Sequence, residues 1–153
     1  MAKLGDQGLS LVGEKRLSKT NPLFQALGDL DELNCFLGLV KTKTRDEKII
    51  FLLEQTQKDL IEIGGVLTGY RPSFSAKKIS YLEDKEKEFS GALKPLKSFV
   101  LPGRSERSVL FHLARAVCRR SERSVFSLGK KIPQGITGYL NRLSTLLFVL
   151  SRS

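Results

Sequence analysis

Residues 99–123 read FVLPGRSERSVLFHLARAVCRRSER, and this stretch sets the interpretation of the whole chain. Pro102 and Gly103 predict a turn, and Ser105 is placed to cap a helix that starts directly after it. Residues three or four apart share one face of a helix, so charged residues at this spacing should lie together. They are Arg115, Arg119, Glu122 and Arg123. A polyphosphate would compensate the clustered guanidiniums well. A solvated basic face is the alternative.

The composition is that of a globular protein with an excess of positive charge. A length of 153 residues, 41% of them hydrophobic and 27% charged, predicts a single domain over residues 1–153. Lys and Arg outnumber Asp and Glu by 26 to 16, and the net charge of +10 favours an anionic partner. Neither a membrane-spanning run nor a signal peptide is apparent, so we expect a cytoplasmic protein with no membrane partner.

The cysteines and the histidine do not indicate a metal site. Cys35 and Cys118 lie in helical patterns outside any CxxC pair, and both are expected to be buried, reduced thiols. His112 has no partner at metal-ligand spacing and is expected to be packed or hydrogen-bonded. We therefore expect no metal ion held by protein ligands.

Residues 1–20 are polar and interrupted by glycines, with no useful periodicity. Gly5 and Gly8 would let backbone N–H groups approach an anion, and Ser10 and Lys19 could add donors. The run GDQG is too short to match a known phosphate-binding fingerprint. A flexible terminus is therefore the alternative to a phosphate-binding loop.

Five helical patterns account for the rest of the chain, and no convincing strand is present. They cover approximately residues 21–42, 46–67, 75–93, 105–128 and 133–153. In the first pattern, apolar residues recur every three or four positions from Phe24 to Val40. Asp31 lies in this segment and could reach an arginine of the later charged face, although an exposed carboxylate is the default. Short loops between helices predict an all-α, antiparallel five-helix bundle over residues 21–153.

Three sequence blocks together resemble the PduO-type ATP:cob(I)alamin adenosyltransferases. They are GDQG with GDLDELN, then FVLPG through FHLARAVCRRSER, and finally YLNRLSTLLFVLSR. The resemblance implies a ferritin-like helical bundle that assembles as a homotrimer, with active sites between subunits. It also implies the reaction, in which cobalt(I) of a corrinoid attacks the 5′ carbon of ATP and triphosphate leaves. The implied substrates are ATP, with Mg²⁺, and cobalamin, and a reductase is a possible partner.

The resemblance also assigns roles to individual residues. Residues 1–20 would form an ATP-binding loop through Gly5, Asp6, Gly8, Ser10 and Lys19. The nucleotide site would be completed by Arg119, Arg120, Glu122, Arg123 and Asn141. Arg119 would be catalytic, together with Phe99, which would press on the lower face of the corrin ring and leave four-coordinate cobalt(II). A core anchor is the alternative role for Phe99. Asp31 and Arg115 would pair across the subunit interface.

Several positions depart from the family pattern. Ala2 removes a hydroxyl from the ATP loop, and Thr145 replaces a carboxylate near Asn141. Arg104 replaces a glycine, so it would either clash with the corrin-side loop or add charge to it. The chain also stops at Ser153, without the tail that many relatives have.

Two other classes of function stay open. One is a non-catalytic family member that binds ATP or corrinoid for delivery or sensing. The other is a basic, helical nucleic-acid-binding protein, although no aromatic stacking platform or nucleic-acid motif accompanies the basic helix.

Overall fold

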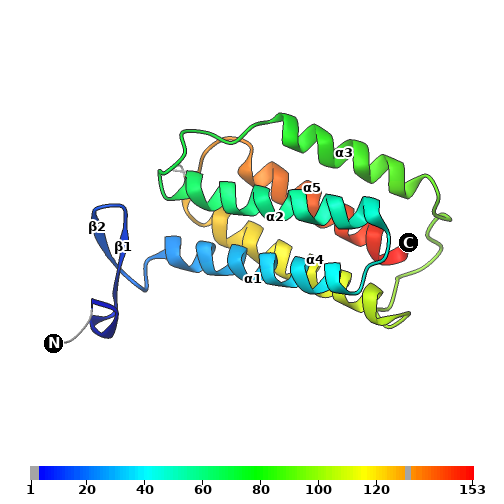
Figure 1. Cartoon of the computed structure of the whole chain (residues 1–153), viewed down its shortest axis with the longest axis horizontal. Helices are drawn as coiled ribbons and strands as arrows, with labels where there is room; N and C mark the ends of the chain where they lie inside the picture. Colours follow the sequence, from blue (N-terminus) through cyan, green and yellow to red (C-terminus); the bar gives the residue numbers. More distant parts are fainter. Residues whose placement is uncertain (1–3, 130–131) are drawn as a thin grey trace.

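The computed structural model describes residues 4–129 and 132–153, so the position of Ala2 lies outside the described residues. Five helices make up most of the part of the chain that the structure describes (Figure 1), which confirms the predicted helical bundle. A short 3₁₀ helix, η1 (Leu4–Gln7), precedes the strands β1 (Leu9–Val12) and β2 (Lys15–Ser18). The helices are α1 (Pro22–Thr42), α2 (Glu47–Leu67), α3 (Lys77–Ser90), α4 (Glu106–Phe126) and α5 (Ile136–Arg152).

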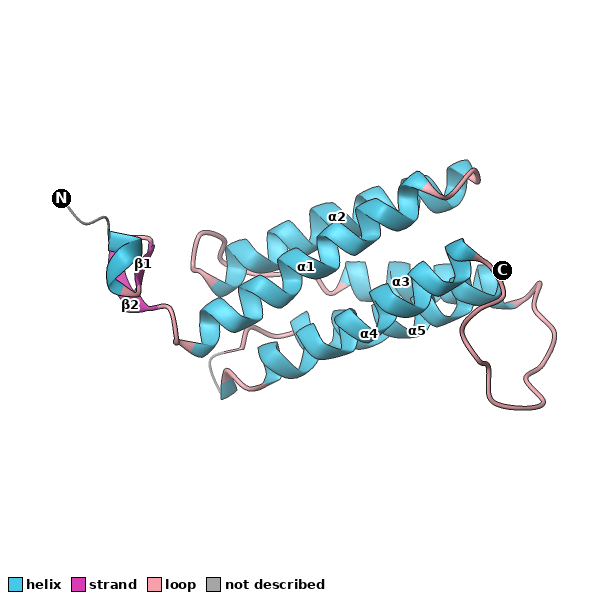
Figure 2. Ribbon diagram, turned by 90° about the horizontal axis from the view of Figure 1, so that it is seen from below, coloured by secondary structure: helices cyan, strands magenta, loops and turns pink. Residues whose placement is uncertain are grey.

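Each helix runs opposite to the one before it, as the two views of the bundle show (Figures 1 and 2). Helix α1 packs against α2 and α4, while α5 packs against α4 and α3. The neighbours α3 and α5 are therefore parallel in an otherwise antiparallel bundle. The connection from α3 to α4, residues 91–105, projects at one end of the bundle (Figure 2). We call it the Phe99 loop.

The helix starts follow local signals in the sequence. The side chain of Asn21 accepts a hydrogen bond from the N–H of Leu23 at 3.0 Å. Ser105 caps α4 as predicted, because its hydroxyl oxygen accepts from the N–H of Ser108 at 3.1 Å. Helix α3 is shorter than predicted at both ends. No side chain caps its start, and Gly91, a weak helix former, follows its last residue.

The apolar faces of all five helices meet in one core. Helix α4 contributes Phe111, Ala114, Val117 and Cys118, which leaves its arginines on the other faces. Burial of a large aliphatic or aromatic side chain contributes about 1.5–3 kcal/mol, so this packing dominates the stability of the bundle. No helix in the described part of the chain is long and apolar enough to cross a membrane.

The two cysteines differ in their surroundings. Cys118 is buried, as predicted, and its thiol donates to the carbonyl of Leu140 at 3.3 Å. Burial raises the pKa of the Cys118 thiol, so this group stays protonated and is not a nucleophile. Cys35 is exposed, and the prediction that it is buried is wrong. Helix α1 packs against α2 and α4 and leaves its remaining face open, where Cys35 lies.

A buried polar network ties α3 to the rest of the bundle. The hydroxyl of Tyr139 on α5 donates to the carboxylate of Asp59 on α2 at 2.8 Å. Lys78 on α3 donates to the same carboxylate at 2.5 Å and to Glu62 at 2.9 Å. Burial by itself would lower the pKa of Lys78. The hydrogen bonds and charges of the two carboxylates have the larger combined effect, so the pKa of Lys78 is raised above its usual value. The network therefore joins three helices through charged hydrogen bonds.

The expectation of no strand is wrong for residues 9–18. β1 and β2 pair in an antiparallel hairpin in which Val12 faces Lys15 across a two-residue turn. Gly13 occupies the first turn position with a φ of 58°, a conformation that glycine adopts without steric cost. Glycine at that position, between short runs with apolar residues, is the sequence signal for this hairpin. The hairpin projects from the bundle beside the start of α1 (Figure 1).

Candidate functional site

Four of the predicted ATP-binding residues lie around one cavity between α4 and α5. The cavity has a volume of about 280 Å³, and we call it the α4–α5 pocket. Its lining consists of Arg119, Glu122, Arg123, Phe126 and Asn141. The amide of Asn141 donates to the carboxylate of Glu122 at 3.1 Å, which joins the two helices at the pocket. The helical spacing predicted that Arg119, Glu122 and Arg123 lie together, and the packing of α5 adds Asn141. Phe126 was not predicted.

The α4–α5 pocket carries positive charge that the described residues do not neutralise. In the described part of the chain, neither Arg119 nor Arg123 forms an ion pair. The guanidinium of Arg123 donates to the backbone carbonyl of Arg119 at 3.1 Å. Glu122 is the carboxylate in the pocket, and Asn141 already holds it. Neighbouring guanidiniums repel one another unless an anion lies between them. The pocket is therefore suited to an anion with several oxygens.

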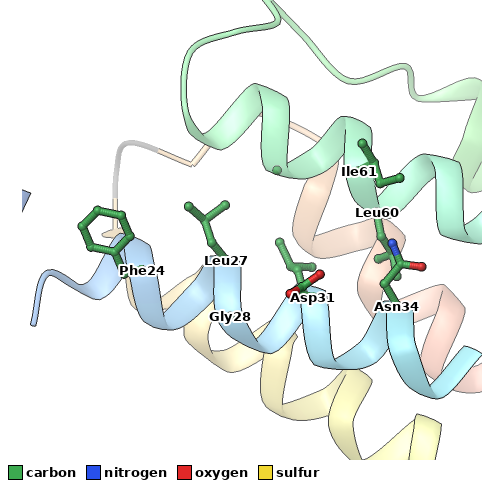
Figure 3. A pocket seen from close by; sticks show the side chains of 9 residues that line it. Phe24, Leu27, Gly28, Asp31, Asn34, Leu60 and Ile61 are labelled. Carbon is green, nitrogen blue, oxygen red and sulfur yellow. The ribbon is translucent and has the colours of Figure 1, made fainter. Parts of the chain in front are cut away.

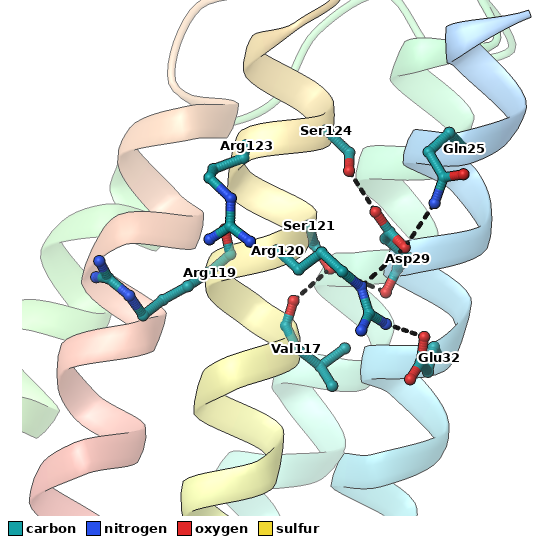
Figure 4. A network of polar contacts seen from close by, with 9 residues as sticks. All are labelled: Gln25, Asp29, Glu32, Val117, Arg119, Arg120, Ser121, Arg123 and Ser124. Atoms are coloured by element: carbon teal, nitrogen blue, oxygen red, sulfur yellow. Dashed lines mark hydrogen bonds and ion pairs between the residues drawn. The ribbon is translucent and has the colours of Figure 1, made fainter.

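Arg120, also predicted to bind ATP, lies outside this pocket. Figure 4 shows its guanidinium directed toward α1, whereas Arg119 points toward α5. Its Nε donates to the carboxylate of Asp29 at 3.1 Å, and its Nη2 pairs with Glu32. Consecutive helical residues point about 100° apart, so two adjacent arginines serve different sides of α4. The structure thus does not bring Arg120 together with Arg119 and Arg123.

Asp29 is the centre of the polar network on that side of α4 (Figure 4). It is 3% exposed, and its carboxylate also accepts hydrogen bonds from Gln25, at 3.0 Å, and from Ser124. The hydroxyl of Ser121 donates to its backbone carbonyl at 2.9 Å. A buried carboxylate is costly unless it is paired and hydrogen-bonded, and this one is both. The sequence interpretation missed Asp29, although an acidic residue within an apolar helical pattern was a usable signal.

We expect Arg120→Ala to lower stability while changing ATP affinity by less than about twofold. Asp29 would lose its charged partner, and because the Arg120 side chain is 41% exposed, solvent reduces the cost to about 1–2 kcal/mol. Chemical denaturation and calorimetry with ATP check the two effects separately. Arg45→Ala, an exposed arginine between α1 and α2, is the control. A loss of ATP affinity as large as that of Arg119→Ala would instead indicate that Arg120 contacts the nucleotide.

The predicted residues of the N-terminal segment form a closed loop. The side chain of Lys19 donates to the carbonyl of Gly5 at 2.9 Å, and its backbone N–H donates to the carbonyl of Gly8 at 2.8 Å. Gly8 has a φ of 69°, in the left-handed region that favours glycine. Asp6 in η1 and Ser10 in β1 belong to the same unit. None of the described residues of this unit lines the α4–α5 pocket.

Phe99 is 87% exposed, so the alternative that it anchors the core is wrong. Leu96 and Leu101 in the same loop are also exposed, at 50% and 78%. The loop thus exposes three large apolar side chains, and Leu96 and Leu101 also line a cavity that Phe99 does not line. Arg104 does not clash in this loop, because its guanidinium donates to the carbonyl of Arg152 at 2.9 Å. Thr145 on α5, the other described position that departs from the family pattern, donates to the backbone carbonyl of Asn141 at 3.3 Å.

Asp31 and Arg115 do not pair with each other in the described part of one chain. Asp31 is exposed in an open groove between α1 and α2, with a volume of about 420 Å³ (Figure 3). Apolar side chains surround it there, and Ile61 among them is 68% exposed. Arg115 lies on α4 with its guanidinium 5.3 Å from the ring centre of Phe148. An exposed groove that is apolar and contains one charge suits an interface between subunits.

His112 is packed, as predicted. Its ring meets the ring of Phe148 edge-on at 6.1 Å, and its buried Nε2 has no hydrogen-bond partner in the described part of the chain. Burial, and then the charge of Arg115, lower the pKa of His112. The ring is therefore neutral near pH 7. Among the described residues, no group of three or more His, Cys, Asp or Glu side chains is placed to hold a metal ion.

The chain is similar to known proteins over its whole length. Residues 1–153 match the family model described as cobalamin adenosyltransferase. The cobalamin adenosyltransferase of Cupriavidus metallidurans is 38% identical over 156 residues, which cover 98% of this chain and 84% of the relative. The corrinoid adenosyltransferase of Mycobacterium bovis is 37% identical over 164 residues, with 98% and 85% covered. A variant PduO-type ATP:corrinoid adenosyltransferase from Lactobacillus reuteri, complexed with cobalamin and ATP, matches with a TM-score of 0.88 at 29% identity, covering 99% of this chain and 91% of that one.

Proposed function

This chain belongs to the cobalamin adenosyltransferase family, and we propose that it transfers the 5′-deoxyadenosyl group of ATP to cob(I)alamin. The electron pair of cobalt(I) forms the cobalt–carbon bond, and the 5′ carbon–oxygen bond breaks as triphosphate takes its bonding pair. Cobalt(I) is already a strong nucleophile, so the protein aligns the ribose carbon and stabilises the charge of the leaving group. The observation that carries this proposal is the pair of uncompensated arginines, Arg119 and Arg123, in the α4–α5 pocket.

We assign the triphosphate to this pair of arginines. Each guanidinium presents a planar fork of donors that matches two phosphate oxygens. The hydrogen bond from Asn141 fixes Glu122 beside them, so the carboxylate is held in one orientation. Mg²⁺ would accompany ATP and neutralise charge on its phosphates. Because the described residues offer no cluster of metal ligands, phosphate oxygens and water would hold most of its coordination positions.

We assign the second half of the ATP site to the glycine-containing loop of residues 1–20. We treat residues 1–153 as a single domain. None of the described residues of this loop lines the α4–α5 pocket of the same chain. We therefore infer that the loop of one subunit closes over the pocket of a neighbour in a homotrimer. The groove that contains Asp31 supports this arrangement, since Arg115 of a neighbouring subunit would supply the missing positive charge.

Phe99 is assigned to the lower face of the corrin ring. Its exposure on a projecting loop supports a role in ligand contact. By occupying the lower axial position it would favour four-coordinate cobalt(II), which is easier to reduce. A separate reductase would then supply the electron. We propose a cytoplasmic location, where ATP is available as the adenosyl donor.

A spectral assay tests the proposal as a whole. The protein, ATP and chemically reduced cobalamin are mixed without oxygen, and the loss of cobalt(I) absorbance is followed together with the formation of adenosylcobalamin. Catalytic turnover supports the enzyme. Tight corrinoid or ATP binding without turnover would instead indicate delivery or sensing. Tight binding to random DNA that weakens steeply with salt would indicate a nucleic-acid-binding protein.

Charge swaps at the proposed interface should change assembly. We expect Asp31→Arg and Arg115→Asp each to weaken the trimer, because each places like charges opposite each other, and the double swap to restore part of it. Light scattering at micromolar concentration measures the effect. Glu54→Arg, which reverses the charge of a half-buried acidic residue of α2 that pairs with Lys41, is the control. A wild type that is a stable monomer at that concentration would contradict the shared site.

A further inference from the structure

Among the residues that the structure describes, the middle of the Phe99 loop, residues 94–104, is fastened to the bundle through one residue, Arg152 at the end of α5. In the described part of the chain, residues 94–104 make two hydrogen bonds, and both involve Arg152. The Nη2 of Arg152 donates to the carbonyl of Lys94 at 2.5 Å. Its own backbone carbonyl accepts from the guanidinium of Arg104 at 2.9 Å. The two tethers therefore hold opposite ends of the loop at the same point.

The guanidinium of Arg152 is itself held in place by an aromatic ring. It lies 5.9 Å from the ring centre of Phe148, one turn earlier on α5. Arg115 contacts the same ring at 5.3 Å, and His112 meets its edge. Contact between a cation and an aromatic ring is attractive and limits the orientations of the guanidinium. Phe148 thus links the tether of the loop to the arginine that we assign to the interface.

Packing contributes little to the position of the loop. Residues 94–99 are all exposed. A cavity of about 420 Å³ lies between the loop and the ends of α4 and α5, where Ser108 and Ser151 form part of its wall. A loop that lies over a cavity keeps much of its conformational freedom unless specific bonds restrict it. The two tethers are those bonds.

We propose that Arg152 and Arg104 are positioning residues that hold Phe99 in a fixed position to contact the lower face of the corrin ring. This inference rests on the proposed function, and neither arginine touches the reacting atoms. Without the tethers, the loop would have to be ordered when the corrinoid binds, and that lost entropy would weaken binding. Glycine, which the resemblance places at position 104, could not form the second tether. That tether is therefore a property of this sequence.

The kinetic test compares Arg152→Ala and Arg104→Gly with the wild type. We expect the KM for corrinoid to rise about tenfold in Arg152→Ala, equivalent to about 1.4 kcal/mol, and less in Arg104→Gly. The yield of four-coordinate cobalt(II) should fall in the same order, and the KM for ATP should stay unchanged. Arg152→Lys keeps a donor for Lys94 and should recover part of the loss. Arg107→Ala is the matched control, because Arg107 donates to the carbonyl of Ser153 and not to the loop.

A second readout needs no substrate. Trypsin can cut after Lys97 in the exposed loop, whereas Pro95 protects the bond after Lys94. Cleavage after Lys97 should be several-fold faster in Arg152→Ala and Arg104→Gly than in the wild type or Arg107→Ala, with unchanged thermal melts. Equal cleavage rates and an equal KM for corrinoid in an active wild type and its variants would overturn the positioning role. A wild type that transfers no adenosyl group would overturn the proposed function instead, while the cleavage rates would still test the tethers.

Discussion

Arg119→Ala is expected to lower the rate of adenosyl transfer by about 100- to 1,000-fold, the usual effect of removing one donor to charge that develops in the transition state. Arg119 lies in the α4–α5 pocket with no ion-pair partner in the described part of the chain, so its removal leaves no buried charge behind. The helical fold should therefore be unchanged. Arg119→Lys keeps the charge but loses the planar fork, and it should recover only part of the rate.

The measurement combines turnover with calorimetry of ATP binding. Arg45→Ala removes one exposed guanidinium elsewhere on this basic protein and controls for the general loss of positive charge. Circular dichroism confirms that each variant is folded. If Arg119→Ala bound ATP with wild-type affinity and turned over normally, the arginines of the pocket would revert to a solvated surface.

Phe99→Ala is expected to abolish the four-coordinate cobalt(II) species that forms when the wild type binds cobalamin(II) and ATP. A small side chain cannot occupy the lower face of the ring, so the axial ligand returns and reduction becomes difficult. Adenosylation of chemically reduced cobalt(I) should persist, because this nucleophile no longer depends on ligand removal. Stability should change by less than about 0.5 kcal/mol, since Phe99 is 87% exposed.

Absorption spectra of the cobalt(II) state and thermal melts test this prediction. Leu101→Ala is the matched control, because Leu101 lies in the same loop and is 78% exposed. A non-catalytic carrier would bind corrinoid without consuming ATP in either protein. An undiminished four-coordinate band in Phe99→Ala would remove Phe99 from the corrin face, whatever the rate with pre-reduced cobalt.

The helices, and the face of α4 that Arg119 and Arg123 share, were determined by the sequence alone. Caps such as Asn21 and Ser105 act within a single helical turn, and their contacts are those expected from local spacing. Arg119 and Arg123 are four residues apart, and any α-helix places them on one face. Such features depend on backbone geometry over a few residues. They do not depend on how the helices pack.

Tertiary structure decided which partner each side chain meets. Arg119 and Arg120 are adjacent in sequence, yet one lies in the α4–α5 pocket and the other pairs with Asp29 on α1. A step of one residue turns a helical side chain by about 100°, so its environment depends on which helix packs at that angle. The tethers from Arg152 also join residues that are distant in sequence. The exposure of Phe99 likewise depends on how the helices pack. Local patterns contain no information on such contacts, because they arise only when packing of the apolar faces brings the helices together.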